Sequence, residues 1–182
     1  MSKLKIAVVT INQPSLDAAC KLVPYLEDYH VDVFGKKDLE HNLDNLNIFN
    51  KIDDIMQPAW EGYDAIVAIL AMGAVVRKIA PFLKDKATDP AVIVIDDKTK
   101  FVISVLSGHI GGANELTQKI AEKLGALPVI TTAADVNQTI AVDLVGREFN
   151  WNIDDDATVT KISAHMVNEE PIGVFQETGK KN

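Results

Sequence analysis

Short apolar runs rich in β-branched residues recur along the first 135 residues and alternate with stretches of helical periodicity. Continuous apolar runs of this length are typical of strands buried on both faces of a sheet. Strands that alternate with helices predict a parallel sheet covered by helices. We therefore expect an α/β fold, a three-layer doubly wound domain with a mostly parallel sheet. The predicted strands are residues 6–11, 31–34, 64–70, 91–95, 101–106 and 128–131, with a further short strand around residues 47–49.

Local signals place helices between most of these strands. Pro14 suits the first turn of a helix that follows the first strand. A short helix is expected from Ile52 to just before Pro58, and another carries Val75 and Ile79. The helix at residues 113–124 has an apolar face, and Gly125 caps its end.

A connection of five residues, 96–100, joins the fourth and fifth apolar runs and predicts a hairpin. Only one strand of a hairpin can run parallel to the rest of the sheet. We expect it to be the second, because the helix at residues 113–124 and the strand after it then form a right-handed crossover unit. The loops that contain Gly73, His109 and Thr131 would then meet at one edge. The reverse orientation puts His109 at the edge opposite Gly73 and Thr131.

The α/β domain is predicted to span residues 1–136, and residues 137–182 are predicted to be part of a second region. That region shows helical patterns at residues 139–149 and 158–167 and a strand-like run at residues 172–175. It is interpreted as the start of a second small α/β unit, because it supplies little core of its own.

Composition excludes several classes of function. The 182 residues carry a formal net charge of −8, which disfavours a nucleic-acid partner because phosphate binding needs a basic face. The chain has one cysteine, Cys20, which fits a reducing cytoplasm and is expected to pack as a small apolar residue. No apolar run is long enough for a signal peptide or a membrane span. We expect a cytoplasmic protein with no membrane partner, and no metal site, because the four histidines form no helical pair.

The stretch at residues 107–115 follows a strand and opens a helix, and it brackets His109 with glycines. An imidazole can accept and return a proton near neutral pH. Gly111 and Gly112 could expose N–H groups to a carboxylate or a developing oxyanion at the helix N-terminus. The alternatives are structural: the histidine packs at a turn, and Glu115 and the glycines only cap the helix.

Two further loops, residues 72–74 and 131–135, follow predicted strands. Their small residues, hydroxyl groups and one carboxylate could bind a ligand or orient His109. Alternatively, Thr132 or Asp135 is only a helix cap. Arg77 and Lys78 are weaker anion candidates that could simply extend into solvent. The candidate catalytic residues are His109, Glu115 and Asp135, and the candidate substrate-binding residues are Gly73, Ala74, Ser107, Gly108, Gly111, Gly112, Asn114, Thr131 and Thr132.

Four segments taken together resemble the CbiG family of cobalamin-biosynthesis proteins, in its N-terminal and middle regions. They are MGAVVR at residues 72–77, KDKATDPAV at residues 84–92, LSGHIGGAN at residues 106–114 and PVITTAAD at residues 128–135. The resemblance implies a cobalt-precorrin 5A hydrolase, which opens a δ-lactone on a cobalt-bearing tetrapyrrole and releases acetaldehyde. It also implies that the cobalt belongs to the substrate, so no cofactor is expected. Because family members usually continue into a separate C-terminal domain, we expect such a domain or protein as a partner.

The residues themselves suggest how the chemistry would run, and these roles are a hypothesis that the resemblance does not establish. Water activated by His109 would attack the lactone carbonyl, and N–H groups of Gly111 or Gly112 would hold the oxyanion. Two alternatives stay open: a non-catalytic module that binds or transfers the tetrapyrrole, and an α/β domain for another small anion.

Overall fold

The computed structural model describes residues 3–175 and 177, with the exception of residues 42, 44, 45, 147–150 and 152–155. The chain divides into two compact units, Met1–Ile130 and Thr131–Asn182. The sequence-based boundary at residue 136 stays a prediction. In the described residues no helix has both the length and the apolar character that crossing a membrane requires.

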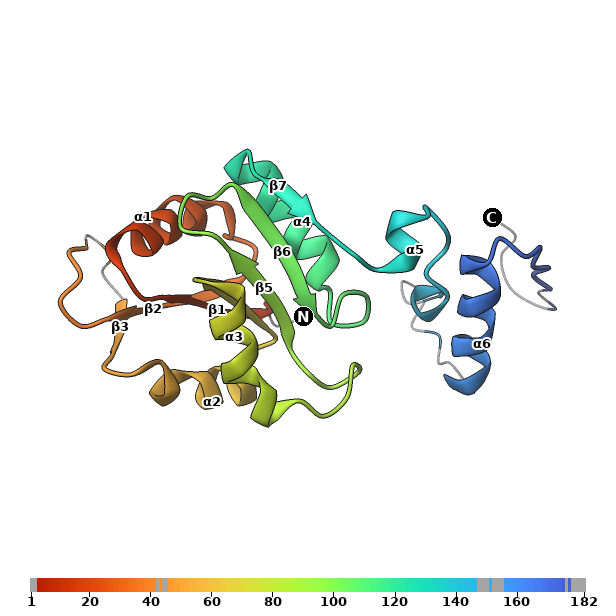
Figure 1. Ribbon diagram of the computed structural model, residues 1–182, viewed down its shortest axis with the longest axis horizontal. Helices are drawn as coiled ribbons and strands as arrows, with labels where there is room; N and C mark the ends of the chain where they lie inside the picture. Colours follow the sequence, from red (N-terminus) through yellow and green to blue (C-terminus); the bar gives the residue numbers. More distant parts are fainter. Residues whose placement is uncertain are drawn as a thin grey trace. The chain divides into compact units, whose positions relative to one another are not determined.

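The first unit is built on one sheet of seven strands in the order β3-β2-β1-β4-β5-β6-β7 (Figure 1). Strands β1 to β5 are mutually parallel, β6 pairs antiparallel to β5, and β7 pairs parallel to β6. The strands are β1 Lys5–Thr10, β2 His30–Lys36, β3 Leu46–Phe49, β4 Ala65–Ile69, β5 Ala91–Ile95, β6 Phe101–Leu106 and β7 Leu127–Val129.

Helices cover both faces of the sheet, which confirms the predicted three-layer architecture. Helices α1 (Gln13–Leu22) and α4 (Ala113–Leu124) pack on one face, where Leu16, Val8, Ile93 and Ile120 are buried together. Helices α2 (Ile52–Gly62) and α3 (Met72–Ile79) pack on the other face, against Val9, Ile66 and Val94. Short 3₁₀ helices follow α1 at Val23–Tyr25 and α3 at Ala80–Phe82.

Helix ends follow the local sequence. Asn12 accepts a hydrogen bond from the backbone N–H of Ser15, and Ser15 accepts one from the Asn12 N–H, which forms a capping box at α1. Gly125 ends α4 in the left-handed conformation, as predicted. Helix α2 does not stop before Pro58 as expected. It continues to Gly62, because Ala59 and Trp60 beyond the proline are buried in the core and offset the lost backbone hydrogen bond.

The predicted orientation of the hairpin is wrong. The first hairpin strand, β5, is the one that runs parallel to β1–β4, whereas β6 runs the other way. The loop after β6 therefore lies at the edge where β1–β5 begin, which we call the amino edge. The loop after β4 lies at the carboxyl edge, where β1–β5 end. His109 and Gly73 are at opposite edges, separated by the five-residue strands β4 and β5, a length of about 16 Å.

The regular secondary structure among the described residues of the second unit is helical. The helices are α5 (Ala133–Val136), a 3₁₀ helix at Val142–Leu144 and α6 (Asp156–Val167). The predicted helix at residues 158–167 is confirmed by α6. Of the helix predicted for residues 139–149, the structure describes residues 139–146, and the helical part of these is the 3₁₀ helix at residues 142–144. Residues 147–149 lie outside the described residues. The strand predicted at residues 172–175 is wrong, because these residues have no regular secondary structure.

Two buried threonines differ in hydrogen bonding, and this difference predicts opposite effects of one substitution. Among the described residues, the Thr117 hydroxyl in α4 is buried without a hydrogen-bond partner, whereas the Thr10 hydroxyl donates to the Phe34 carbonyl at 3.0 Å. We expect Thr117→Val to raise the free energy of unfolding by about 1 kcal/mol. Thr10→Val should lower it by about 1–2 kcal/mol. Urea unfolding of both variants measures the effects, and a loss of stability in Thr117→Val would contradict the expectation.

Candidate functional site

Two of the loops singled out from the sequence meet at the amino edge. Residues 84–90 lead into β5, residues 107–112 leave β6, and Val92 pairs with Leu106 where the two strands adjoin. The Ser107 hydroxyl donates a hydrogen bond of 2.9 Å to the Asp89 carbonyl, so the loops are tied together. This edge therefore combines two of the four segments on which the family resemblance rests.

The N-terminus of α4 is closed by its own loop. The backbone N–H groups of Ala113 and Asn114 donate to the carbonyls of Ser107 and Gly108, at 3.1 and 3.0 Å. The Gly112 N–H donates to the His109 carbonyl at 3.0 Å, and Gly112 adopts the left-handed conformation with φ of +80°. The Gly112 N–H is therefore engaged within the loop in this conformation, and its role as an oxyanion donor stays a prediction. The exposed Gly111 stays a predicted donor.

The candidate side chains of this loop differ in accessibility. His109 is half-buried and Glu115, in the first turn of α4, is exposed. Ser107 and Asn114 are buried, and the Asn114 amide oxygen accepts a hydrogen bond of 2.7 Å from the Ser104 hydroxyl. The geometry favours Ser107 and Asn114 as supports of the loop that carries the half-buried His109.

Gly73 and Ala74 belong to the carboxyl edge. They lie in the first turn of α3, whose last turn carries Arg77, and the Arg77 guanidinium donates to the Gly73 carbonyl at 2.8 Å. The expectation that Gly73 shares a cleft with His109 is therefore wrong. Any contact of Gly73 and Ala74 with a substrate would have to occur at the carboxyl edge.

A cavity of about 420 Å³ opens at the carboxyl edge, where β1 and β4 end and their following helices leave on opposite faces. This is the topological switch point at which open α/β sheets bind ligands. Its walls are mainly apolar, and two of its three polar side chains form hydrogen bonds with nearby backbone groups. Asn12 caps α1, and the Asp96 carboxylate accepts the N–H groups of Lys98 and Phe101 at 3.0 and 2.6 Å. The lining residues are Ile11, Asn12, Ile69, Leu70, Ala71, Met72, Val94, Asp96, Asp97, Phe101 and Ile103.

The remaining candidates, Thr131, Thr132 and Asp135, belong to the second unit. Thr132 precedes α5, and its carbonyl accepts the Val136 N–H at 3.0 Å. Asp135 lies within this four-residue helix and is exposed. Their roles as substrate or catalytic groups stay predictions.

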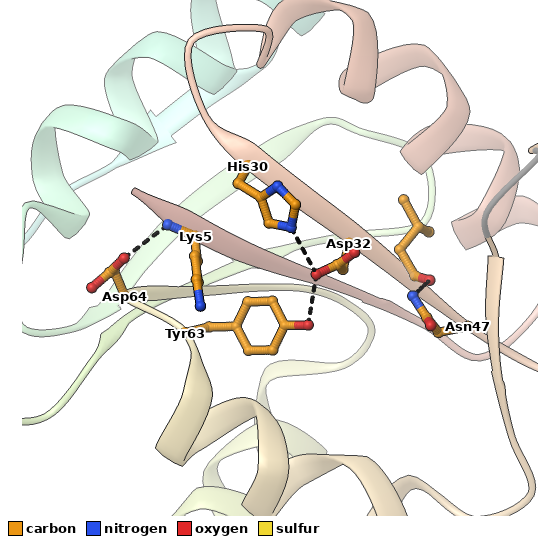
Figure 2. Close-up of polar contacts among 7 residues, drawn as sticks. Lys5, His30, Asp32, Asn47, Tyr63 and Asp64 are labelled. Atoms are coloured by element: carbon orange, nitrogen blue, oxygen red, sulfur yellow. Dashed lines mark hydrogen bonds and ion pairs between the residues drawn. The ribbon is translucent and has the colours of Figure 1, made fainter. Parts of the chain in front are cut away.

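A polar cluster that the sequence did not indicate lies in the amino-terminal half of β2. Figure 2 shows the side chains of His30 and Tyr63 directed at Asp32: the Tyr63 hydroxyl donates to Asp32 Oδ2 at 2.8 Å, and His30 Nε2 lies 3.5 Å from the same atom. Partial burial first, and then the bond to Asp32 and its negative charge, raise the pKa of Tyr63 to about 12. Because 31 residues separate Asp32 from Tyr63, no local spacing could have predicted the contact.

Among the described residues, neither Cys20 nor a group of potential metal ligands forms a further site. Cys20 is a half-buried residue of α1 that packs against the core, and its burial raises the pKa of the thiol. Within the part of the chain that the structure describes, no three His, Cys, Asp or Glu side chains are grouped so as to hold a metal ion.

The sheet order, the helices on both faces and the edge loops define a doubly wound α/β protein. Two family models match the chain: the cobalamin synthesis G N-terminal region over residues 54–135 and the cobalamin biosynthesis central region over residues 140–182. The chain belongs to the CbiG family, of which it contains the N-terminal and central regions.

Two curated relatives agree with this assignment, and one solved structure shares the fold. The chain is 48% identical over 180 residues to a cobalt-precorrin-5A hydrolase of Priestia megaterium, covering 97% of this chain and 48% of the relative. It is 45% identical over 118 residues to a protein of the same name from Salmonella typhimurium, covering 64% and 34%. The chain thus spans half or less of the length of these relatives. A cobalamin biosynthesis protein G homologue from Sulfolobus solfataricus shares the fold, with a TM-score of 0.57, 23% identity and coverage of 98% and 52%.

The Tyr63 contact predicts a pH dependence of stability. Because the native pKa of Tyr63 lies above the ordinary value of 10, the stabilisation is fully present below pH 10 and is lost as the pH rises through about 12. We expect Tyr63→Phe to be less stable than the wild type at pH 8, and the difference to shrink between pH 10 and 12. Unfolding curves at pH 8 and 11.5 measure it, with the exposed Tyr25→Phe as control. A difference that stays constant across this range would contradict the assignment.

Proposed function

We propose that this chain is the N-terminal and central part of a cobalt-precorrin-5A hydrolase. The observation that carries the proposal is the 48% identity to the Priestia megaterium hydrolase over 97% of this chain. The substrate would be a cobalt-bearing tetrapyrrole, with the cobalt as part of the substrate. A cytoplasmic location and a C-terminal domain or partner protein that completes the enzyme belong to the same proposal.

The proposed reaction has two bond-breaking steps. Water adds to the lactone carbonyl, its proton passes to a base, and the acyl–oxygen bond breaks to give a carboxylate and an alcohol. The alcohol then loses its proton, the adjacent carbon–carbon bond breaks, and acetaldehyde leaves. The electron pair stays on a carbon of the macrocycle, which takes up a proton. Both steps need a group that accepts a proton and returns it, which is the role of a general base.

We assign the base to His109 at the amino edge. Its half-buried ring lies on a loop that hydrogen bonds tie to the residue 84–90 segment and to α4. Gly111 is the remaining candidate for a donor to the oxyanion, since the Gly112 N–H is engaged. Glu115 is exposed in the first turn of α4 and is the second candidate for a group that transfers protons at this edge.

A second candidate function is a binding module that leaves the chemistry to the partner. It is favoured by the separation of His109 from the cavity, which lie at opposite edges of the sheet. A tetrapyrrole bound at the carboxyl edge would be out of reach of the imidazole.

The two functions are separated by a binding titration followed by an assay. We expect the chain to bind a cobalt corrinoid with free carboxylates, cobyrinic acid, as followed by its absorption spectrum. With cobalt-precorrin-5A as substrate, it should release acetaldehyde. His109→Gln should lower turnover by about 10²–10⁴-fold with an unchanged dissociation constant, because only proton transfer is removed. The control is His41→Gln, an exposed histidine outside the site, which should behave as wild type.

The other possible outcomes distinguish between the two functions and test the role of His109. Binding without acetaldehyde release supports the binding module, and no binding contradicts both corrinoid functions. Acetaldehyde release at the wild-type rate by His109→Gln excludes His109 as the base.

A further inference from the structure

The loop between β6 and α4 is surrounded by an unusual share of the buried polar side chains. Six polar or charged residues are buried among the described ones, and three of them, Asp89, Ser107 and Asn114, lie in or against this loop. A buried polar group costs free energy unless it is hydrogen-bonded. Their concentration therefore marks a place where one backbone conformation is fixed.

Ser107 holds a strained conformation at the start of the loop. Its φ of +56° lies in the left-handed region, which costs a residue other than glycine about 1–2 kcal/mol. The strain is held at both ends: the Ser107 hydroxyl donates to the Asp89 carbonyl at 2.9 Å, and the Ser107 carbonyl accepts the Ala113 N–H at 3.1 Å. Asp89 is itself fixed, since its carboxylate accepts the Lys84 N–H at 3.0 Å.

The glycines on either side of His109 permit this compact turn. A Cβ at Gly111 would lie 2.5 Å from the Ser107 Cβ, and a Cβ at Gly108 would lie 2.7 Å from the Asn114 amide oxygen. The segment therefore packs directly on Ser107 and Asn114. His109 lies between these two contacts, on a backbone that is held from both sides.

We propose that Ser107 is a positioning residue for His109: its hydrogen bond to the Asp89 carbonyl fixes the left-handed turn that aims the imidazole at the substrate. The inference rests on the proposed function, because that function gives His109 its proton-transfer role. Ser107 itself touches neither water nor substrate in this assignment. It acts by holding the reacting group within the small range of positions in which proton transfer is efficient.

Replacing Ser107 by glycine separates positioning from stability. Glycine adopts a φ of +56° without strain but lacks the hydroxyl, so Ser107→Gly should stay folded while the loop loses its tie to Asp89. We expect kcat for acetaldehyde release to fall by about ten- to a hundredfold, with KM changed by less than about twofold. The matched control is Thr99→Gly in the 96–100 turn at the opposite edge, where φ is +53°, and it should leave kcat unchanged.

A second variant provides the rescue. Ser107→Thr keeps the hydroxyl but places a β-branched residue in the left-handed region, so it should be less stable than Ser107→Gly and yet more active. A purely structural role would rank the two activities in the order of their stabilities. Should Ser107→Thr fold poorly, ¹⁵N spectra of the His109 ring in Ser107→Gly supply the second readout. They should show exchange broadening that is absent from the wild type and from Thr99→Gly.

The possible failures can be told apart. Wild-type kcat in Ser107→Gly together with an inactive His109→Gln would overturn the positioning role and leave the proposed function intact. Activities that follow the stabilities of the variants would also overturn it. Full activity of His109→Gln would exclude His109 as the base and overturn this inference, while the hydrolase function stands. A wild type that releases no acetaldehyde would overturn the proposed function and this inference with it.

Discussion

The antiparallel pairing of β5 with β6 decides at which edge of the sheet each later segment lies. The five-residue turn between them is closed by the Asp96 carboxylate, which accepts the N–H groups of Lys98 and Phe101. A connection this short leaves no room for a crossover, so β6 has to return alongside β5. The two strands after that turn, β6 and β7, run opposite to β1–β5, and the loop that carries His109 is brought to the amino edge.

The reversal gives the two edges different properties. The carboxyl edge keeps the usual features of a doubly wound sheet: a switch point between β1 and β4 and a cavity with mainly apolar walls. The amino edge gains a strand end that it would otherwise lack, and with it a loop stiffened by three buried polar residues. A small ligand is more easily accommodated at the first edge, whereas a side chain is more accurately positioned at the second.

The sequence predicted the elements better than their directions. The apolar runs and Gly125 located the strands and the end of α4, because burial and backbone conformation act locally. The direction predicted for β6 was wrong, because the crossover rule on which the prediction rested constrains only β6, α4 and β7 relative to one another. Those two strands are indeed parallel, and the rule is satisfied equally well when both run against the rest of the sheet. Helix α2 shows the other limit: packing of Ala59 and Trp60, which no local signal reveals, carries the helix past Pro58.

The hydrogen bonding of the loop before α4 could not be predicted for a related reason. Glycines before a helix indicate that N–H groups are close to the surface, but they do not indicate which carbonyls turn back toward them. Here the carbonyls of Ser107, Gly108 and His109 occupy the N–H groups of Ala113, Asn114 and Gly112. The N–H groups at the N-terminus of α4 thus stabilise the preceding loop, and under the proposed function they affect proton transfer only indirectly. Under the proposed function, this loop serves lactone hydrolysis mainly through the placement of one imidazole, with the exposed Gly111 as the remaining candidate donor.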